Sequence, residues 1–326
     1  MLKALADWFG FGGHHHHHGG HDHDHDDHHH HAHGVVDPTI VSTSRGIFAI
    51  KWSFVLLAVT AALQMLVVAA SGSIALLADT IHNIGDATTA IPLWIAFLLA
   101  RRKPTATFTY GYGRVEDLAG IVIVLVILFS AIVAGYEAVS RFIHPQAIGH
   151  LGWVAVAGLI GFAGNEAVAL FRIRIGREIN SAALIADGYH ARTDGLTSLA
   201  VVVGAAGVWL GFPLADPIIG VLITIAIFGI VWQSARAVVT RTLDGVEPEV
   251  LEEIRHAAGH VPGLRLESAK ARWIGHRLHA DLVVSLDGNP PVTAALAQAD
   301  ALKATLRDHL PALGEATVSF AGGPRG

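Results

Sequence analysis

Residues 181–200 read SAALIADGYHARTDGLTSLA. It has the length and apolar character of a helix buried in a membrane, which takes about 20 residues. It nevertheless carries ionisable side chains, among them Asp187, His190 and Asp194. A charged group at the centre of a bilayer costs about 3 kcal/mol, so it needs a partner or a bound ion to be tolerated.

The composition is that of a multi-pass membrane protein. Of the 326 residues, 52% are hydrophobic and 15% are charged, which is too apolar for an ordinary soluble enzyme. We therefore expect an all-α six-helix transmembrane domain over residues 45–240, embedded in a lipid bilayer. Its predicted spans are 47–70, 73–99, 115–142, 151–171, 181–209 and 214–238.

Basic residues indicate the orientation, because Lys and Arg concentrate in cytoplasmic connections. The connections assigned to the other side of the membrane, at residues 71–73, 144–150 and 211–216, contain no Lys or Arg. Both termini are therefore expected in the cytoplasm. The absence of a targeting segment and the Ala/Gly/Val-rich composition favour a bacterial plasma (inner) membrane. The basic residues that we assign to the cytoplasmic side are Arg45, Lys51, Arg101, Arg102, Lys103, Arg114, Arg172, Arg174 and Arg177.

The two ends of the chain differ in kind. Residues 1–44 are predicted to be a disordered cytoplasmic tail, because their His/Asp-rich tract cannot bury a core. Such a tail would bind metal ions loosely and without fixed geometry. Its histidines are His14, His15, His16, His17, His18, His21, His23, His25, His28, His29, His30, His31 and His33. Residues 241–326 alternate in a pattern that predicts a small α/β cytoplasmic domain, ferredoxin-like, in the order α-β-β-α-β.

Two His-Asp pairs carry the chemistry. LLADTIHNIGDATT in the second span holds His82 and Asp86, and ADGYHARTDG in the fifth holds His190 and Asp194. Residues four apart share one face of a helix. If the two helices face each other, two nitrogen and two oxygen donors surround one point, which suits tetrahedral Zn²⁺. One such pair alone is as well explained by packing, but two pairs inside spans favour a metal site. The chain has no cysteine, so thiolate ligands are excluded.

These motifs resemble those of the cation diffusion facilitator family of metal/proton antiporters, from about residue 45 to near the end of the chain. The matching pieces are SGSIALLADTIHNIGDA, YGYGRVEDLAG, GREINSAALIADGYHARTDGLTSLAVVVG and DPIIG. The resemblance implies a homodimeric transporter with a metallochaperone-like cytoplasmic domain. No nucleophile–base set or nucleotide-binding loop stands out in the sequence, so an enzyme is not expected. His82, Asp86, His190 and Asp194 match the family's transport ligands. The resemblance further implies Zn²⁺ efflux by alternating access. The efflux would be driven by protons, which compete with Zn²⁺ for the same four donors.

Other residues leave alternatives open. Asp79 and Asp187 each lie three residues before a predicted ligand, and either orient its imidazole ring or act as cap and packing groups. Asn165 and Glu166 either line the metal path or bond across helices. Arg114 and Asp244 match family positions that resemble a charge interlock. Otherwise Arg114 is a cytoplasmic anchor and Asp244 a solvated turn residue.

The resemblance breaks in two places. Thr105, Phe108 and Tyr112 stand where the family often has loop ligands, so no metal site is expected there. Ser319 stands where a ligand histidine is common. Five other residues of the cytoplasmic domain either hold a regulatory metal ion or are ordinary surface groups: His256, His260, His276, His279 and Asp281.

The sequence leaves other functions open. The four donors also suit Co²⁺, Ni²⁺, Fe²⁺, Mn²⁺ or Cd²⁺, because such a ligand set does not give selectivity by itself. A second class is a membrane protein that stores or senses metal without transport, although such a protein needs no ligands at membrane depth. No nucleic-acid partner is expected.

Overall fold

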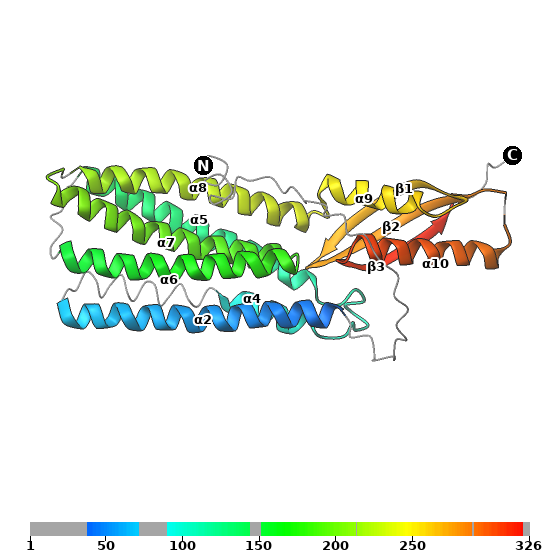
Figure 1. Ribbon diagram of the computed structural model, residues 1–326, viewed down its shortest axis with the longest axis horizontal. Helices are drawn as coiled ribbons and strands as arrows, with labels where there is room; N and C mark the ends of the chain where they lie inside the picture. The colour runs from blue at the N-terminus through cyan, green and yellow to red at the C-terminus, as the bar shows by residue number, and fades with distance from the viewer. Residues whose placement is uncertain (1–37, 72–89, 144–150, 213, 289, 322–326) are drawn as a thin grey trace, which may run out of the picture.

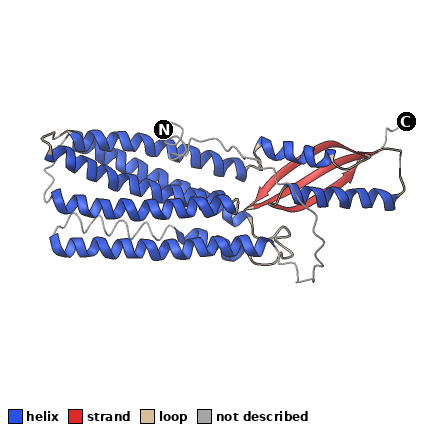
Figure 2. Ribbon diagram, in the orientation of Figure 1, coloured by secondary structure: helices blue, strands red, loops and turns tan. Residues whose placement is uncertain are grey.

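The computed structural model describes residues 38–71, 90–143, 151–212, 214–288 and 290–321. A bundle of long helices occupies one end of the molecule and a small α/β domain the other (Figure 1). Figure 2 shows that all the strands belong to the second part. The predicted fold class, a helical membrane part followed by a small α/β domain, is confirmed.

The described part of the bundle contains helices long enough to cross a bilayer. Four of these described helices, α2, α5, α6 and α8, combine that length with sufficient apolarity. Part of the predicted second span falls outside the described residues, so the count of six spans stays a prediction. The bounds of the bundle helices are α2 (Pro38–Ser71), α4 (Ala90–Ala100), α5 (Arg114–Ile143), α6 (Leu151–Glu178), α7 (Ala182–Trp209) and α8 (Ala215–Thr242).

The prediction for the end of the fourth span is wrong. The span was expected to end at residue 171 and to be followed by a loop holding Arg172, Arg174 and Arg177. Instead α6 continues to Glu178. Asn180 then reverses the chain with φ of 56°, a left-handed conformation that Asn tolerates better than most residues. The Ser181 side chain caps the next helix by accepting a hydrogen bond from the Leu184 N–H at 3.1 Å.

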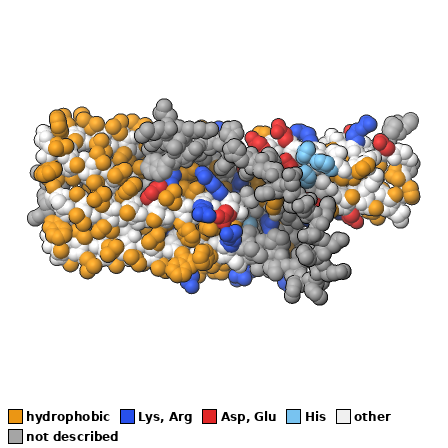
Figure 3. All heavy atoms as spheres, in the orientation of Figure 1, with side chains coloured by type: hydrophobic (Ala, Val, Ile, Leu, Met, Phe, Trp, Pro, Cys, Tyr) orange, Lys and Arg blue, Asp and Glu red, His pale blue; other side chains and the backbone are white. Residues whose placement is uncertain are grey.

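Helix α7 is the inner helix of the bundle. It contacts α4, α5, α6 and α8, and every residue from Ala186 to Thr193 is buried. The outer helices instead expose large apolar side chains, such as Phe129 on α5 and Trp232 on α8. Figure 3 shows this apolar surface covering the helical end. The ionisable residues of α7 are therefore directed at protein, and the surface around them is suited to lipid.

The α/β domain has the predicted order of elements. It consists of α9 (Pro248–Gly259), β1 (Leu264–Ile274), β2 (Arg277–Leu286), α10 (Val292–His309) and β3 (Leu313–Phe320). The sheet order is β1-β2-β3, with β2 antiparallel to β1 and parallel to β3. Ile254, Leu282 and Leu302 are fully buried in the core between the sheet and the two helices. This domain thus has a hydrophobic core of its own.

Candidate metal centre

Helix α7 places His190 and Asp194 on one face. The His190 Nδ1 lies 3.8 Å from the Asp194 Oδ1, and their side chains are 2% and 12% exposed. The spacing of four residues makes this geometry a property of the helix itself. One imidazole and one carboxylate are thus held together in the interior of the bundle, which is half of the predicted ligand set.

The other predicted half lies outside the described residues. His82 and Asp86, together with Asp79, fall within residues 72–89. Among the residues that the structure does describe, no three His, Asp or Glu side chains already converge as a formed metal site. The meeting of the two His-Asp pairs therefore stays a prediction. The histidines of the tail, His14 to His33, also fall outside the described ranges.

Asp187 has a partner that the sequence did not indicate. Its Oδ2 lies 2.9 Å from the Arg172 Nη1, and both side chains are almost fully buried, at 0% and 2% exposed. Arg172 was predicted to lie in a cytoplasmic loop, which is wrong: it projects from α6 into the bundle. The signal that could have found it is the apolar sequence on both sides of Arg172, which continues the helix.

A second ion pair joins the same two helices. Arg192 donates from Nη2 to the Glu166 Oε1 at 2.7 Å and from Nε to the Oε2 at 3.1 Å. This two-point geometry is the strongest that Arg forms with a carboxylate. Of the alternatives for Glu166, the structure displays bonding across helices. The two pairs lie on either side of His190 along α7 and hold that helix to α6.

Arg114 and Asp244 also meet. The Arg114 Nη2 donates to the Asp244 Oδ1, and Arg272 of β1 approaches the other oxygen at 3.9 Å. Asp244 follows α8 with φ of 61°, where a left-handed residue ends the helix. This contact ties α5 to the chain between α8 and the α/β domain.

The turn between β1 and β2 inserts into the end of the helical bundle. His276 is buried there, with its Nδ1 2.7 Å from the Glu116 Oε2 of α5. Its Nε2 lies 3.5 Å from the Thr43 hydroxyl of α2. We call this contact, His276 with Glu116 and Thr43, the joint. Sequence reasoning missed Glu116 because a single acidic residue at a helix start is ordinary.

The joint separates residues that the sequence grouped. His276 contacts Glu116 of α5. The Nδ1 of His279 instead lies 3.6 Å from the Glu315 carboxylate on β3. Burial lowers the pKa of His279, more than the nearby Glu315 raises it. Asp281 pairs in register with Lys270 of β1. His256 on α9 and His260 directly after that helix lie elsewhere, so the five predicted candidates do not form one cluster.

Residues 50–241 match the family model described as the cation efflux transmembrane domain. That match covers more than half of the chain. The chain belongs to the cation efflux family. The predicted resemblance to cation diffusion facilitators is thereby confirmed, and the protein is an integral membrane protein of a transporter family.

Relatives of this cation efflux protein carry related names. A probable cation efflux system protein of Mycobacterium tuberculosis is 58% identical over 253 residues, which cover 77% of this chain and 76% of that protein. Magnetosome protein MamB of Magnetospira is 28% identical over 249 residues, covering 74% and 84% of the two chains. Zinc transporter ZitB of Escherichia coli is 28% identical over 200 residues, covering 60% and 63%.

A solved structure of a variant of MamM CTD is similar to part of this cation efflux protein. It is 26% identical and covers 24% of this chain and 94% of its own, with a TM-score of 0.22.

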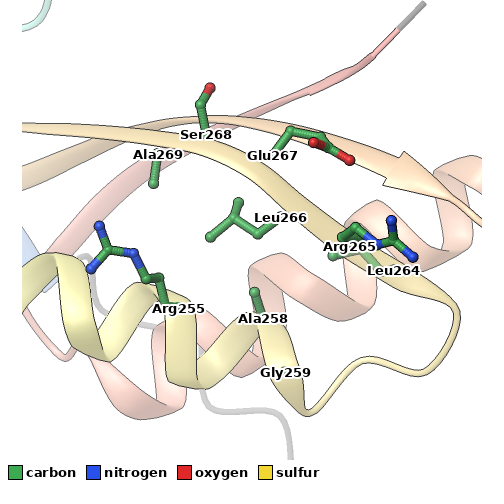
Figure 4. A pocket seen from close by; sticks show the side chains of 9 residues that line it. All are labelled: Arg255, Ala258, Gly259, Leu264, Arg265, Leu266, Glu267, Ser268 and Ala269. Atoms are coloured by element: carbon green, nitrogen blue, oxygen red, sulfur yellow. The ribbon is translucent and has the colours of Figure 1, made fainter. Parts of the chain in front are cut away.

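A pocket of about 420 Å³ lies on the α/β domain between α9 and β1. Figure 4 shows Arg255 and Arg265 toward its two ends, with Glu267 and Leu266 on the strand side. Its lining residues include no histidine, and it lies in the α/β domain, whereas α7 lies in the helical bundle. The pocket is thus separate from the His190–Asp194 pair of this cation efflux protein.

Proposed function

We propose that this protein exports Zn²⁺ from the cytoplasm in exchange for protons, by alternating access. The observation that carries the proposal is the His190–Asp194 pair, buried within a helix of a cation efflux protein and 3.8 Å apart. An imidazole and a carboxylate at this depth are costly unless they hold a cation or each other. Transport gives a reason for both residues.

His82 and Asp86 would complete the site. Their spacing repeats that of His190 and Asp194, so one helix face would again present one nitrogen and one oxygen donor. Four such donors satisfy tetrahedral Zn²⁺, and two carboxylates balance its charge. The ion pairs Arg172–Asp187 and Arg192–Glu166 would keep α7 fixed against α6 while the ion binds.

The same donors explain the coupling to protons. Imidazole must be neutral and carboxylate ionised to bind a metal ion, so binding releases protons and protonation releases the ion. A site that faces first the cytoplasm and then the other side would exchange Zn²⁺ for protons. The orientation requires cytoplasmic termini, in a bacterial inner membrane, and we expect the working unit to be a homodimer.

Zinc is the favoured ion because of the His₂Asp₂ set and because one relative is named a zinc transporter. Co²⁺, Ni²⁺, Fe²⁺, Mn²⁺ and Cd²⁺ are the alternatives, since two nitrogen and two oxygen donors accept them as well. Storage or sensing without transport is the second class of function. The burial of the His190 and Asp194 donors within the bundle favours transport over storage or sensing.

Vesicle transport tests this proposal. Purified protein is reconstituted with an imposed pH gradient, and the flux of Zn²⁺ and of competing ions is followed for the wild type and for Asp194→Ala. Gradient-driven Zn²⁺ flux that Asp194→Ala abolishes is the expected result. Metal uptake that ignores the gradient would contradict transport and would favour storage.

Two further variants serve as controls. Asp300→Asn removes an exposed carboxylate on α10, far from α7 in the sequence and in another domain, and should leave the flux unchanged. Deletion of residues 14–33 should also leave transport largely intact, because a loosely binding tail can raise the local metal concentration without forming the path.

A further inference from the structure

Three histidine rings meet on the surface of the α/β domain. His256 and His260 lie four residues apart at the end of α9, and His309 is the last residue of α10. The ring centroids are 4.6 Å apart for His256 and His260, 5.5 Å for His256 and His309, and 5.3 Å for His260 and His309. Figure 3 shows histidine side chains gathered on this part of the surface.

These separations are compatible with rings that share one ion after small rotations. A Zn–N bond of about 2 Å places the centre of an imidazole about 3 Å from the metal, so two rings on a tetrahedral ion have centres about 5 Å apart. The three measured separations lie on both sides of that value. No three donors in the described ranges already converge, so the rings must turn. His256 and His260 are exposed and have room to do so.

A carboxylate already orients the third ring. The Glu253 Oε1 lies 2.8 Å from the His309 Nδ1, which leaves the His309 Nε2 for another partner. Carboxylates in this position hold metal-binding histidines in the required tautomer. Glu253 and His256 also lie on one face of α9, three residues apart, and His260 follows the helix four residues after His256.

The backbone adds to the attraction for a cation. The cluster lies where α9 and α10 both end, since His260 follows α9 directly and His309 closes α10. The carboxyl end of a helix carries about half a negative charge. Two such ends and the Glu253 carboxylate therefore favour a positive ion at the same place.

We propose that His256, His260 and His309, with Glu253 behind His309, bind a divalent cation of the Zn²⁺, Co²⁺, Ni²⁺ or Cu²⁺ type. We call these four residues the α9–α10 site. Imidazole nitrogen is a ligand that these ions prefer over Mg²⁺ and Ca²⁺. The site differs from the predicted group of five by adding His309 and Glu253 and by leaving out His276, His279 and Asp281. It lies in the other domain than the transport site and does not depend on it.

Residue-resolved footprinting of the full chain in detergent tests the proposal. Diethyl pyrocarbonate modifies accessible imidazoles, and mass spectrometry of the peptides reports each histidine separately from those of the tail and of α7. Added Zn²⁺ should protect His256, His260 and His309 together, with one shared midpoint. Mg²⁺ at the same concentration should not protect them. Protection of the three rings at unrelated midpoints, or none at all, would overturn the site.

Variants make the test specific. Glu253→Gln should raise the Zn²⁺ midpoint about tenfold or more, because it removes the group that orients His309. Glu252→Gln, the same change one residue earlier on an exposed face of α9, should leave it unchanged. His309→Ala should remove the shared protection of His256 and His260, and equal midpoints with and without His309 would contradict the site. Asp194→Ala should not alter it, so loss of transport and loss of this site are told apart.

Discussion

At the scale of residues, the inner helix is held by charges rather than by apolar contacts alone. Asp187 and Arg192 lie on either side of His190, and each pairs with an opposite charge on α6. A buried pair of this kind adds little net stability compared with apolar residues, but breaking it leaves an isolated charge. The pairs therefore fix how α7 is placed against α6, and with it the direction of His190.

Removal of one member of the Arg172–Asp187 pair should be costly. Asp187→Leu leaves the Arg172 charge buried without its partner, which should lower stability by about 3–5 kcal/mol. Replacement of both, Arg172→Met with Asp187→Leu, should recover most of that loss, because no charge is then buried. Thermal unfolding of the protein in detergent measures both. Equal losses for the single and the double variant would show that the pair is not what stabilises this position.

At the scale of elements, α6 and α7 approach closely through glycine. A Cβ on Gly188 would lie 2.7 Å from the Ile173 Cγ1 and 3.0 Å from the Ile173 backbone nitrogen. On Gly195, seven residues later on α7, the nearest atom would be the Asn165 Cβ at 3.4 Å. The contact around Gly188 therefore has no room for a methyl group, whereas the contact around Gly195 has.

This difference predicts opposite results for the same substitution. Gly188→Ala should destabilise the protein by about 1–3 kcal/mol, because the helices must separate, and should reduce zinc flux by displacing His190. Gly195→Ala should be neutral or slightly stabilising, since Ala favours helix over Gly by about 1 kcal/mol. Unfolding temperature and vesicle flux are the readouts. A harmless Gly188→Ala would contradict the close contact.

The elements show what the sequence could and could not predict. Apolar runs and alternating patterns located the helices and strands, and α10 begins and ends at the predicted residues, Val292 and His309. The end of α6 was missed because arginine counts as a loop signal unless its buried partner is known. Contacts between distant residues, such as Glu116 with His276, leave no local pattern. The meeting of His82 with His190 remains a prediction because His82 lies outside the described residues.

At the scale of the whole molecule, the joint connects the two domains. His276 and Glu116 have side chains only 4% and 2% exposed. His276→Ala would leave the Glu116 carboxyl buried without this partner, which should cost about 1–3 kcal/mol. Limited proteolysis between α8 and α9 should become faster as the domains separate. His279→Ala, in the same domain but outside the joint, serves as the control, and equal cleavage rates for the two variants would contradict the role of the joint.

Glu247, at the start of α9, forms an ion pair with Arg241 of α8 at 3.4 Å. Burial alone would raise its pKa, but the Arg241 charge and hydrogen bonds from Trp273 and Arg241 hold the pKa below its ordinary value. A lowered pKa stabilises the folded state above the ordinary value of about 4.3, and that stability is lost as the pH falls through the lowered pKa. The Trp273 Nε1 donates to the Glu247 Oε2 at 3.0 Å.

Glu247→Gln should therefore lower the unfolding temperature at pH 7, and the difference from the wild type should fade below about pH 4. Glu249→Gln, on an exposed carboxylate in the first turn of α9, should show no such dependence. Thermal unfolding at a series of pH values is the measurement. A difference that persists at low pH would indicate that packing, and not the charge, is what Glu247 contributes.

His82 and His190 are proposed to contact one ion, and the absence of native cysteine allows a direct test. In a His82→Cys, His190→Cys variant, two thiolates that share a site should be bridged by one Hg²⁺ per chain, because thiolate is a soft ligand that prefers a soft ion. At one Hg²⁺ per chain, both thiols should then resist modification by maleimide. The control variant combines His82→Cys with Thr197→Cys, a position exposed on α7. It should need two Hg²⁺ per chain for the same protection. Two independent Hg²⁺ in the His82–His190 variant, under every condition of pH and metal, would contradict the account.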